Sequence, residues 1–257
     1  SGFSIDIDLD EKNNKNSTDG VLKLRILNSN LKFNFNYNEN TLNINNSFFR
    51  SKNLSFKNES FITLEPFFNS KSKFDIEEID VEFFNQFKID ELLKSKNILK
   101  KINTKNEISF SSRKFNRSFF DKLNLKFDLA YGRLNYSKKI LISDDVIQCK
   151  GYVNLLEEFP LLSFDCSINS ENKRDLLKKF NIDVKNDNKT FNLNFKGNLS
   201  ILNQKINFKD ISLNENYKAS NEDLNYFKEN FENILFNENF LGIFNFDKIK
   251  KFITEIS

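Results

Sequence analysis

The stretch that decides the fold is TFNLNFKGNLSILNQKINFKDISL, residues 190–213. Its apolar residues Phe191, Leu193 and Phe195 are separated by single polar residues. Alternation of this kind is typical of a β-strand that buries one face and exposes the other to water. A one-residue shift between Phe208 and Ile211 predicts a β-bulge. The stretch therefore predicts a run of antiparallel strands with one apolar face.

The same two-residue period extends over most of the 257 residues. Short polar segments such as Asn38-Glu39-Asn40 separate the runs and suit hairpin turns. Since the chain has only 6 Gly and 2 Pro, Asn, which tolerates positive φ, must take most turn positions. The alternating apolar residues include Phe3, Ile5, Ile7, Leu9, Leu22, Leu24, Ile26, Leu31, Phe33, Phe35, Tyr37, Leu42, Ile44, Leu54, Phe56, Phe61, Leu123, Leu125, Phe127 and Leu129.

Four segments follow a helical period instead. Residues 89–103 and 171–180 predict two short internal helices. Ser220 followed by Asp223 is a capping-box pattern at the start of an amphipathic helix. A second amphipathic helix is expected from about Asn245. Both C-terminal helices need an apolar surface to lie on, and the apolar face of the preceding strands is the nearest one.

The predicted fold is mainly β with a few helices. We expect one long, curved antiparallel β-sheet with a groove-like apolar face, short internal helices, and two C-terminal amphipathic helices that pack on the sheet. The expected segments are a β-meander at residues 1–88, a helical insertion at 89–103, a β-meander that continues the same sheet at 104–218, and a helical cap at 219–257.

The residue types present predict neither catalysis nor metal binding. The chain has no His, which removes the commonest general base and metal ligand. Two Cys without His cannot complete a four-ligand zinc site, and no P-loop or dinucleotide-binding glycine motif occurs. We therefore expect no enzyme, no cofactor and no metal. A net charge of +3 lacks the basic excess of nucleic-acid-binding domains, so no nucleic-acid partner is expected.

The two cysteines, Cys149 and Cys166, fall opposite each other if a hairpin turn centres on Glu157-Glu158. Both belong to the apolar side of their runs. Two interpretations stay open. The cysteines are either two small buried hydrophobic side chains or a disulfide, which would fit an oxidising compartment.

Hydropathy predicts no membrane-spanning helix within this sequence. No run of about 18 apolar residues predicts a transmembrane helix, and no signal peptide is visible. The sequence starts with Ser1-Gly2 directly before a strand pattern. We expect it to be a piece of a longer protein whose anchor lies upstream.

Residues 190–213 also resemble the repeated strand signature of the AsmA-like family of bacterial envelope proteins. The shared features are an alternating strand, a Gly, a short apolar strand, a polar turn, a further strand, and a D-x-x-L ending at Asp210 and Leu213. Residues 74–103 resemble the linker regions of such proteins, and residues 220–256 resemble their C-terminus. The N-terminal membrane helix of that family is missing from this sequence.

The resemblance implies a non-enzymatic periplasmic protein, tethered to the inner membrane of a Gram-negative bacterium. It would shelter phospholipid acyl chains on an apolar β-groove and support lipid transport and outer-membrane assembly. Its partners would be phospholipid, the membrane through the upstream anchor, and envelope proteins. The alternative is a structural or interaction module of the cell envelope, a scaffold or adhesin with a closed β core and no lipid ligand.

Two sets of residues follow from these expectations. The expected lipid-facing residues are Phe33, Phe35, Leu42, Ile44, Leu123, Leu125, Phe127 and Leu129. The expected core beneath the C-terminal helices consists of Phe191, Leu193, Phe195, Leu224, Phe227 and Phe231.

Overall fold

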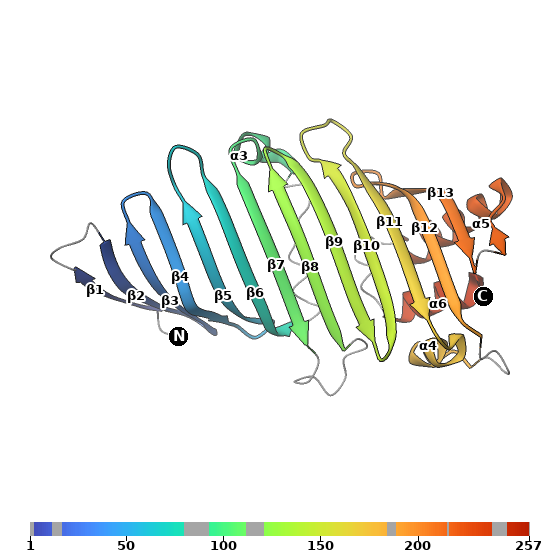
Figure 1. The fold of residues 1–257 in the computed structure, drawn as a ribbon, viewed down its shortest axis with the longest axis horizontal. Helices are drawn as coiled ribbons and strands as arrows, with labels where there is room; N and C mark the ends of the chain where they lie inside the picture. Colours follow the sequence, from blue (N-terminus) through green and yellow to red (C-terminus); the bar gives the residue numbers. More distant parts are fainter. Residues whose placement is uncertain are drawn as a thin grey trace. The chain divides into compact units, whose positions relative to one another are not determined.

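The computed structural model describes residues 3–11, 17–79, 93–111, 121–183, 189–214, 216–237 and 246–256. Within them, fourteen strands form one sheet whose order in space follows their order in the chain (Figure 1). The prediction of a mainly β fold built on an open antiparallel sheet, with two helices near the C-terminus, is confirmed.

The chain divides into two compact units. Residues 1–116 and 124–134 form the first, and residues 117–123 and 135–257 form the second. The first unit holds seven complete strands, most of an eighth, and one short helix among its described residues: β1 Phe3–Glu11, β2 Ser17–Ile26, β3 Ser29–Asn38, β4 Thr41–Arg50, β5 Leu54–Thr63, β6 Asn69–Ile79, α3 Lys96–Leu99, β7 Asn103–Ser111 and β8 Lys122–Ala130.

Backbone pairing in the first unit joins apolar positions across successive strands. Phe35 of β3 lies opposite Gly20 of β2 and opposite Ile44 of β4. Nearer the other end of β4, Phe49 lies opposite Phe56 of β5. The face that carries these residues is the apolar face of the first unit.

One pair of strands departs from the antiparallel prediction. Strands β6 and β7 run parallel, from Asn69 opposite Asn103 to Ile76 opposite Phe110. Parallel neighbours need a crossover of a dozen residues or more, and residues 80–102 make this connection. The helix predicted at residues 89–103 corresponds to α3 there, while residues 89–92 lie outside the described residues.

A bulge in β4 changes which side chains reach the apolar face. Asn46 has a φ of 46°, and the pairing with β5 shifts between Ile44 and Ser47. Because one residue is inserted, Ser47 rather than Asn46 lies on the apolar face, where it is 1% exposed. Phe49 then follows on the same face, which simple alternation from Ile44 does not predict.

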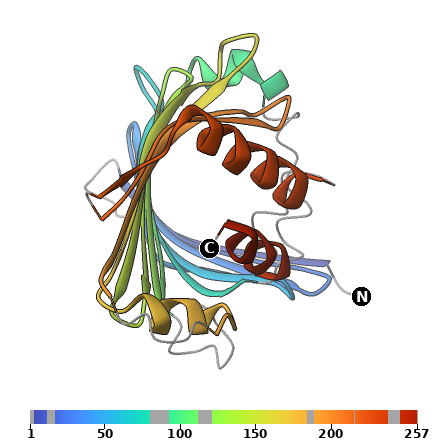
Figure 2. The same ribbon diagram turned by 90° about the vertical axis from the view of Figure 1, so that its right-hand side faces the viewer.

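The second unit holds the remaining strands and three helices of the described chain. Figure 2 shows α5 and α6 on the concave side of its strands. The bounds are β9 Arg133–Ile142, β10 Asp145–Asn154, β11 Leu161–Ser170, α4 Lys173–Lys179, β12 Phe191–Ser200, β13 Lys205–Leu213, β14 Tyr217–Lys218, α5 Asn221–Leu235 and α6 Phe246–Ile256.

Helices α5 and α6 cover part of the apolar face of this unit, defined as the face that carries Cys149, Phe164 and Phe195. Phe208 of β13 meets Phe231 of α5 edge to face, with ring centroids 5.9 Å apart. The buried residues beneath and within these helices form one core of the second unit: Phe164, Cys166, Leu199, Ile206, Phe208, Ile211, Ile234, Leu235 and Phe236.

Several local predictions for the second unit are confirmed. The hydroxyl of Ser220 accepts a hydrogen bond from the Asp223 amide, and the Asp223 carboxylate accepts one from the Ser220 amide, which completes the capping box of α5. The helix predicted at residues 171–180 is α4. The predicted bulge is present, since Lys196 pairs with Asp210 and Gly197 pairs with Phe208.

Candidate ligand-binding face

Four of the expected lipid-facing residues gather on two neighbouring strands. Phe33 and Phe35 belong to β3, and Leu42 and Ile44 belong to β4. Phe35 pairs with Ile44, and Leu42 pairs with Tyr37. All four side chains are half-buried. The structure therefore brings these four together on the apolar face of the first unit.

The other four expected residues lie on β8. The Asn124 amide donates a hydrogen bond of 2.9 Å to Glu107 of β7, and Lys126 lies 3.6 Å from the same carboxylate. Glu107 is on the opposite side of β7 from its neighbour Ile108, which pairs with Phe74 on the apolar face. Asn124 and Lys126 are therefore on the side of Glu107, and alternation places four half-buried residues of β8 on the side of Ile108: Leu123, Leu125, Phe127 and Leu129.

Strand β1 carries the most exposed apolar residues of this face. Phe3, Ile5, Ile7 and Leu9 are 67%, 52%, 59% and 56% exposed. Their partners on β2 are Ile26, Leu24, Leu22 and Gly20. We call these four β1 side chains the β1 row. A row of four large apolar side chains in water is unusual for a soluble protein and typically marks a binding surface.

The opposite face of β1 is acidic. Asp6, Asp8 and Asp10 alternate with the β1 row, and all are exposed. The Lys23 ammonium of β2 lies 3.5 Å from the Asp6 carboxylate. The strand thus separates an apolar side from a charged side within nine residues.

Sequence alternation missed an aromatic row on the same face. The rings of Phe49 and Phe56 stack at 5.4 Å, and Phe56 meets Phe74 of β6 edge to face at 5.5 Å. Alternation did not predict Phe49 on this face because the bulge at Asn46 shifts the pattern by one residue. Phe61, expected to continue the apolar series of β5, lies on the other face opposite Lys71 and is 49% exposed.

Buried polar side chains interrupt the apolar face on β5 to β7. The Ser60 hydroxyl lies 2.9 Å from the Ser72 hydroxyl and 3.1 Å from the side-chain oxygen of Asn58. The Ser70 hydroxyl donates to Thr104 of β7 at 2.6 Å. Hydrogen bonding of this kind is what burial of polar groups requires. The face is therefore mainly apolar over β1 to β4, where Ser47 is a buried polar exception, and mixed over β5 to β7, which departs from the expected apolar groove.

In the second unit, five of the six residues expected beneath the C-terminal helices pack against the buried core. Among the described residues, Phe191 is not part of this packing; its half-buried ring lies 6.0 Å from the Lys173 ammonium of α4. Phe191 is at the start of β12, opposite Ser170, and so lies toward α4. The expected residues that do pack against the core are Leu193, Phe195, Leu224, Phe227 and Phe231.

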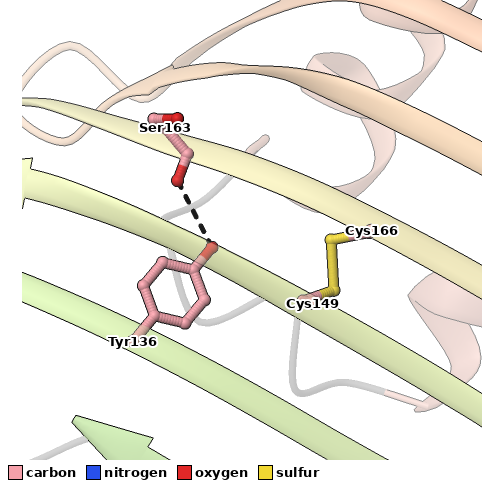
Figure 3. Close-up of a disulfide and its surroundings, with 4 residues drawn as sticks. All are labelled: Tyr136, Cys149, Ser163 and Cys166. Carbon is pink, nitrogen blue, oxygen red and sulfur yellow. Dashed lines mark hydrogen bonds between the residues drawn. A yellow bond between two sulfur atoms is a disulfide. The ribbon is translucent and has the colours of Figure 1, made fainter.

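Cys149 and Cys166 lie directly opposite each other on β10 and β11 and form a disulfide (Figure 3). The turn between their strands includes Glu157 and Glu158, as the sequence predicted. Figure 3 also shows the Tyr136 hydroxyl of β9, which lies 3.5 Å from the backbone oxygen of Ser163. Of the two interpretations left open by the sequence, the structure therefore has the disulfide.

Titratable groups in the second unit have shifted pKa values. Burial lowers the pKa of Lys138 and raises the pKa of Tyr136, both on β9. Burial also raises the pKa of Asp145, an effect partly offset by a hydrogen bond with Ser170.

Across the described ranges, no group of three or more cysteine or carboxylate side chains is arranged to hold a metal ion. No described helix is long and apolar enough to cross a bilayer.

Comparisons of the chain with protein-family models, with curated proteins and with solved structures give no match.

Proposed function

We propose that this chain is an AsmA-like segment of the cell envelope that shelters phospholipid acyl chains on the apolar face of its first unit. In this role it supports lipid transport and outer-membrane assembly. The observation that carries the proposal is the β1 row, whose four large apolar side chains are each more than half exposed. Next to the β1 row, Ile7 pairs with Leu22 of β2 and Leu22 pairs with Phe33 of β3. Phe35 of β3 then pairs with Ile44 of β4.

The physical case concerns the cost of exposing acyl chains to water. Each CH₂ group transferred into water costs about 0.8 kcal/mol, so a two-chain phospholipid faces a barrier on the order of 20 kcal/mol. A protein surface of Phe, Ile and Leu side chains lowers that barrier by replacing water around the chains. The acidic face of β1 stays in water at the same time. No covalent step is needed for this function.

The proposed location is the periplasm, with a tether to the inner membrane of a Gram-negative bacterium. The disulfide between Cys149 and Cys166 supports an oxidising compartment, since disulfides are rare in the cytosol. The proposed partners are phospholipid, the membrane through an upstream anchor, and envelope proteins.

Native mass spectrometry of protein purified from a bacterial host tests the proposal. The wild-type chain is expected to retain phospholipid, and the variant Ile5→Asp/Ile7→Asp is expected to lose it. Both replaced side chains are more than half exposed, so the charges do not disturb a packed core. The matched control is Asp6→Ser/Asp8→Ser, on the acidic face of the same strand.

The control is expected to retain lipid as the wild type does. Wild-type protein that carries no phospholipid contradicts the proposal, and so does a double-aspartate variant that carries as much lipid as the control. Circular dichroism of each variant verifies that the fold is intact, so that lipid loss is not caused by unfolding.

A second candidate is a structural or interaction module of the envelope. The observation that favours it is the core of the second unit, where Phe208 is buried and its ring meets Phe231 of α5, as in a closed interior. This function predicts lipid-free wild-type protein. It also predicts that the β1 row contacts another protein, so that photo-crosslinks from Ile7 give protein adducts rather than lipid adducts.

A further inference from the structure

Lys138 is a basic residue on the apolar side of β9. The half-buried residues of that strand include Tyr136, Lys138 and Ile140, and they alternate with exposed Ser137 and Lys139. Two neighbouring lysines therefore lie on opposite faces. Lys139 is on the solvent side, where charged side chains are expected, and Lys138 is among apolar side chains, where they are not.

Contacts of Tyr136 define the surroundings of Lys138. A β-carbon added to Gly151 of β10 would lie 2.8 Å from the Tyr136 ring, so these two residues are neighbours across the two strands. Two residues further along β9, Lys138 therefore lies level with Cys149 in an antiparallel pair. The helix-covered core reaches Cys149 on β10 and includes no residue of β9 among those described. Lys138 is thus one strand beyond the edge of that core.

Within the part of the chain that the structure describes, the Lys138 ammonium has no carboxylate partner. The Asp165 carboxylate of β11 lies on the opposite face of the sheet, where Lys150 and Lys196 are 3.9 Å and 3.5 Å from it. A cation that is partly removed from water and unpaired costs free energy, and burial accordingly lowers the pKa of Lys138. An anion placed against the ammonium would recover part of that cost.

We infer that Lys138 binds the acid group of an anionic acyl ligand, whose chain lies against the half-buried side chains of Tyr136, Ile140 and Ile147. The acid group is a carboxylate or a phosphate, because both accept charge-assisted hydrogen bonds from an ammonium. The inference rests on the proposed function in that the ligand has an acyl chain. It adds a second binding position, within the second unit and separate from the β1 row, and a preference for anionic ligands.

Binding measurements with matched ligands test this inference. The probes are oleate and neutral monoolein, which share the acyl chain, together with inorganic phosphate, which has none. The variants are Lys138→Met and the control Lys139→Met, which removes the neighbouring charge on the exposed face. We expect Lys138→Met to weaken oleate binding about tenfold or more and to leave monoolein binding within about twofold. Lys139→Met leaves both unchanged, and phosphate at millimolar concentration does not displace oleate.

The possible results separate the inference from the proposed function. If the wild type binds monoolein and oleate but Lys138→Met does not weaken oleate binding, the inference is wrong and the proposed function stands. A Lys138 side chain that reaches water along its aliphatic stem would give this result. Equal loss of oleate and monoolein binding also overturns the inference, because the residue would then shape the surface rather than select charge. Displacement of oleate by phosphate alone shows a simple anion site and excludes the acyl ligand. A wild type that binds neither acyl probe contradicts both proposals.

Discussion

The ring of Phe164 on β11 lies over Gly197 of β12. A β-carbon added to Gly197 would be 2.6 Å from Phe164 Cζ and 2.3 Å from the backbone oxygen of Asn207, distances that real β-carbons do not show. The two residues are directly paired across the strands, and Phe164 belongs to the helix-covered core. The absence of a side chain at position 197 is therefore what leaves room for the ring.

Gly197→Ala is expected to destabilise the protein by about 2 kcal/mol, because overfilling a packed site forces side chains and backbone to move. Chemical denaturation monitored by circular dichroism measures the change. The matched control is Asn194→Ala, an exposed position of the same strand, with an expected effect within about 0.5 kcal/mol. Equal stability of the two variants would contradict this account, since it would mean that both the Phe164 ring and the Asn207 backbone move aside without cost.

Glu232 of α5 attaches that helix to the edge of β13. Its carboxylate accepts a hydrogen bond of 2.9 Å from the Ile206 amide and one of 3.0 Å from the Lys205 ammonium. Glu232→Ala leaves the amide without its partner, and we expect a loss of about 2 kcal/mol in the free energy of unfolding. Glu232→Gln keeps an acceptor and should lose less.

The control for this experiment is Glu229→Ala, an exposed position on the same helix. If Glu232→Ala unfolds at the same denaturant concentration as the control, the carboxylate does not fix α5 to the sheet.

The buried carboxyl of Asp145 should make the free energy of unfolding depend on pH. Its side chain is 7% exposed, and burial raises the pKa of its carboxyl above the usual value, with smaller contributions from Asp144 and Asp175 in the same direction. A raised pKa means that the folded state favours the protonated form. Asp145 therefore adds most stability below its unfolded pKa, and this contribution is lost as the pH rises through the folded pKa.

Asp145→Asn removes the buried charge and keeps an acceptor for Ser170. We expect the variant to be more stable than the wild type at pH 7, by up to about 1 kcal/mol, and this difference to shrink as the pH is lowered. Thermal unfolding over a range of pH measures both effects. Asp128→Asn, at an exposed position of β8 that does not contribute to the Asp145 shift, is the control. A variant at position 145 that is less stable than the wild type at pH 7 would contradict this account.

Alternation predicted the strands well because burial of one face imposes a period of two on each of them. Two local features were also predicted, each from its own pattern. The Ser220-Asp223 spacing predicted the capping box, and the shift in alternation after Phe208 predicted the bulge. Alternation could not give the direction of β7, since the path of the crossover decides whether a strand runs parallel to its neighbour.

The candidate face was harder to predict than the fold. The bulge at Asn46 moved Ser47 and Phe49 onto the apolar face, and a single inserted residue reverses every later assignment on a strand. The buried hydroxyl of Ser60 is satisfied by Ser72 of another strand, a partner that the sequence around Ser60 does not reveal. The exposure of the β1 row depends on what covers it, which periodicity alone does not determine.

The most direct measurement places a photo-crosslinking amino acid at Ile7 or at Asp8, adjacent exposed positions on opposite faces of β1. Each protein is irradiated in its bacterial host, purified, and analysed by mass spectrometry for phospholipid adducts. If the apolar face of the first unit holds acyl chains, position 7 gives phospholipid adducts and position 8 does not. Absence of lipid adducts at position 7, or equal yields at the two positions, would contradict the account.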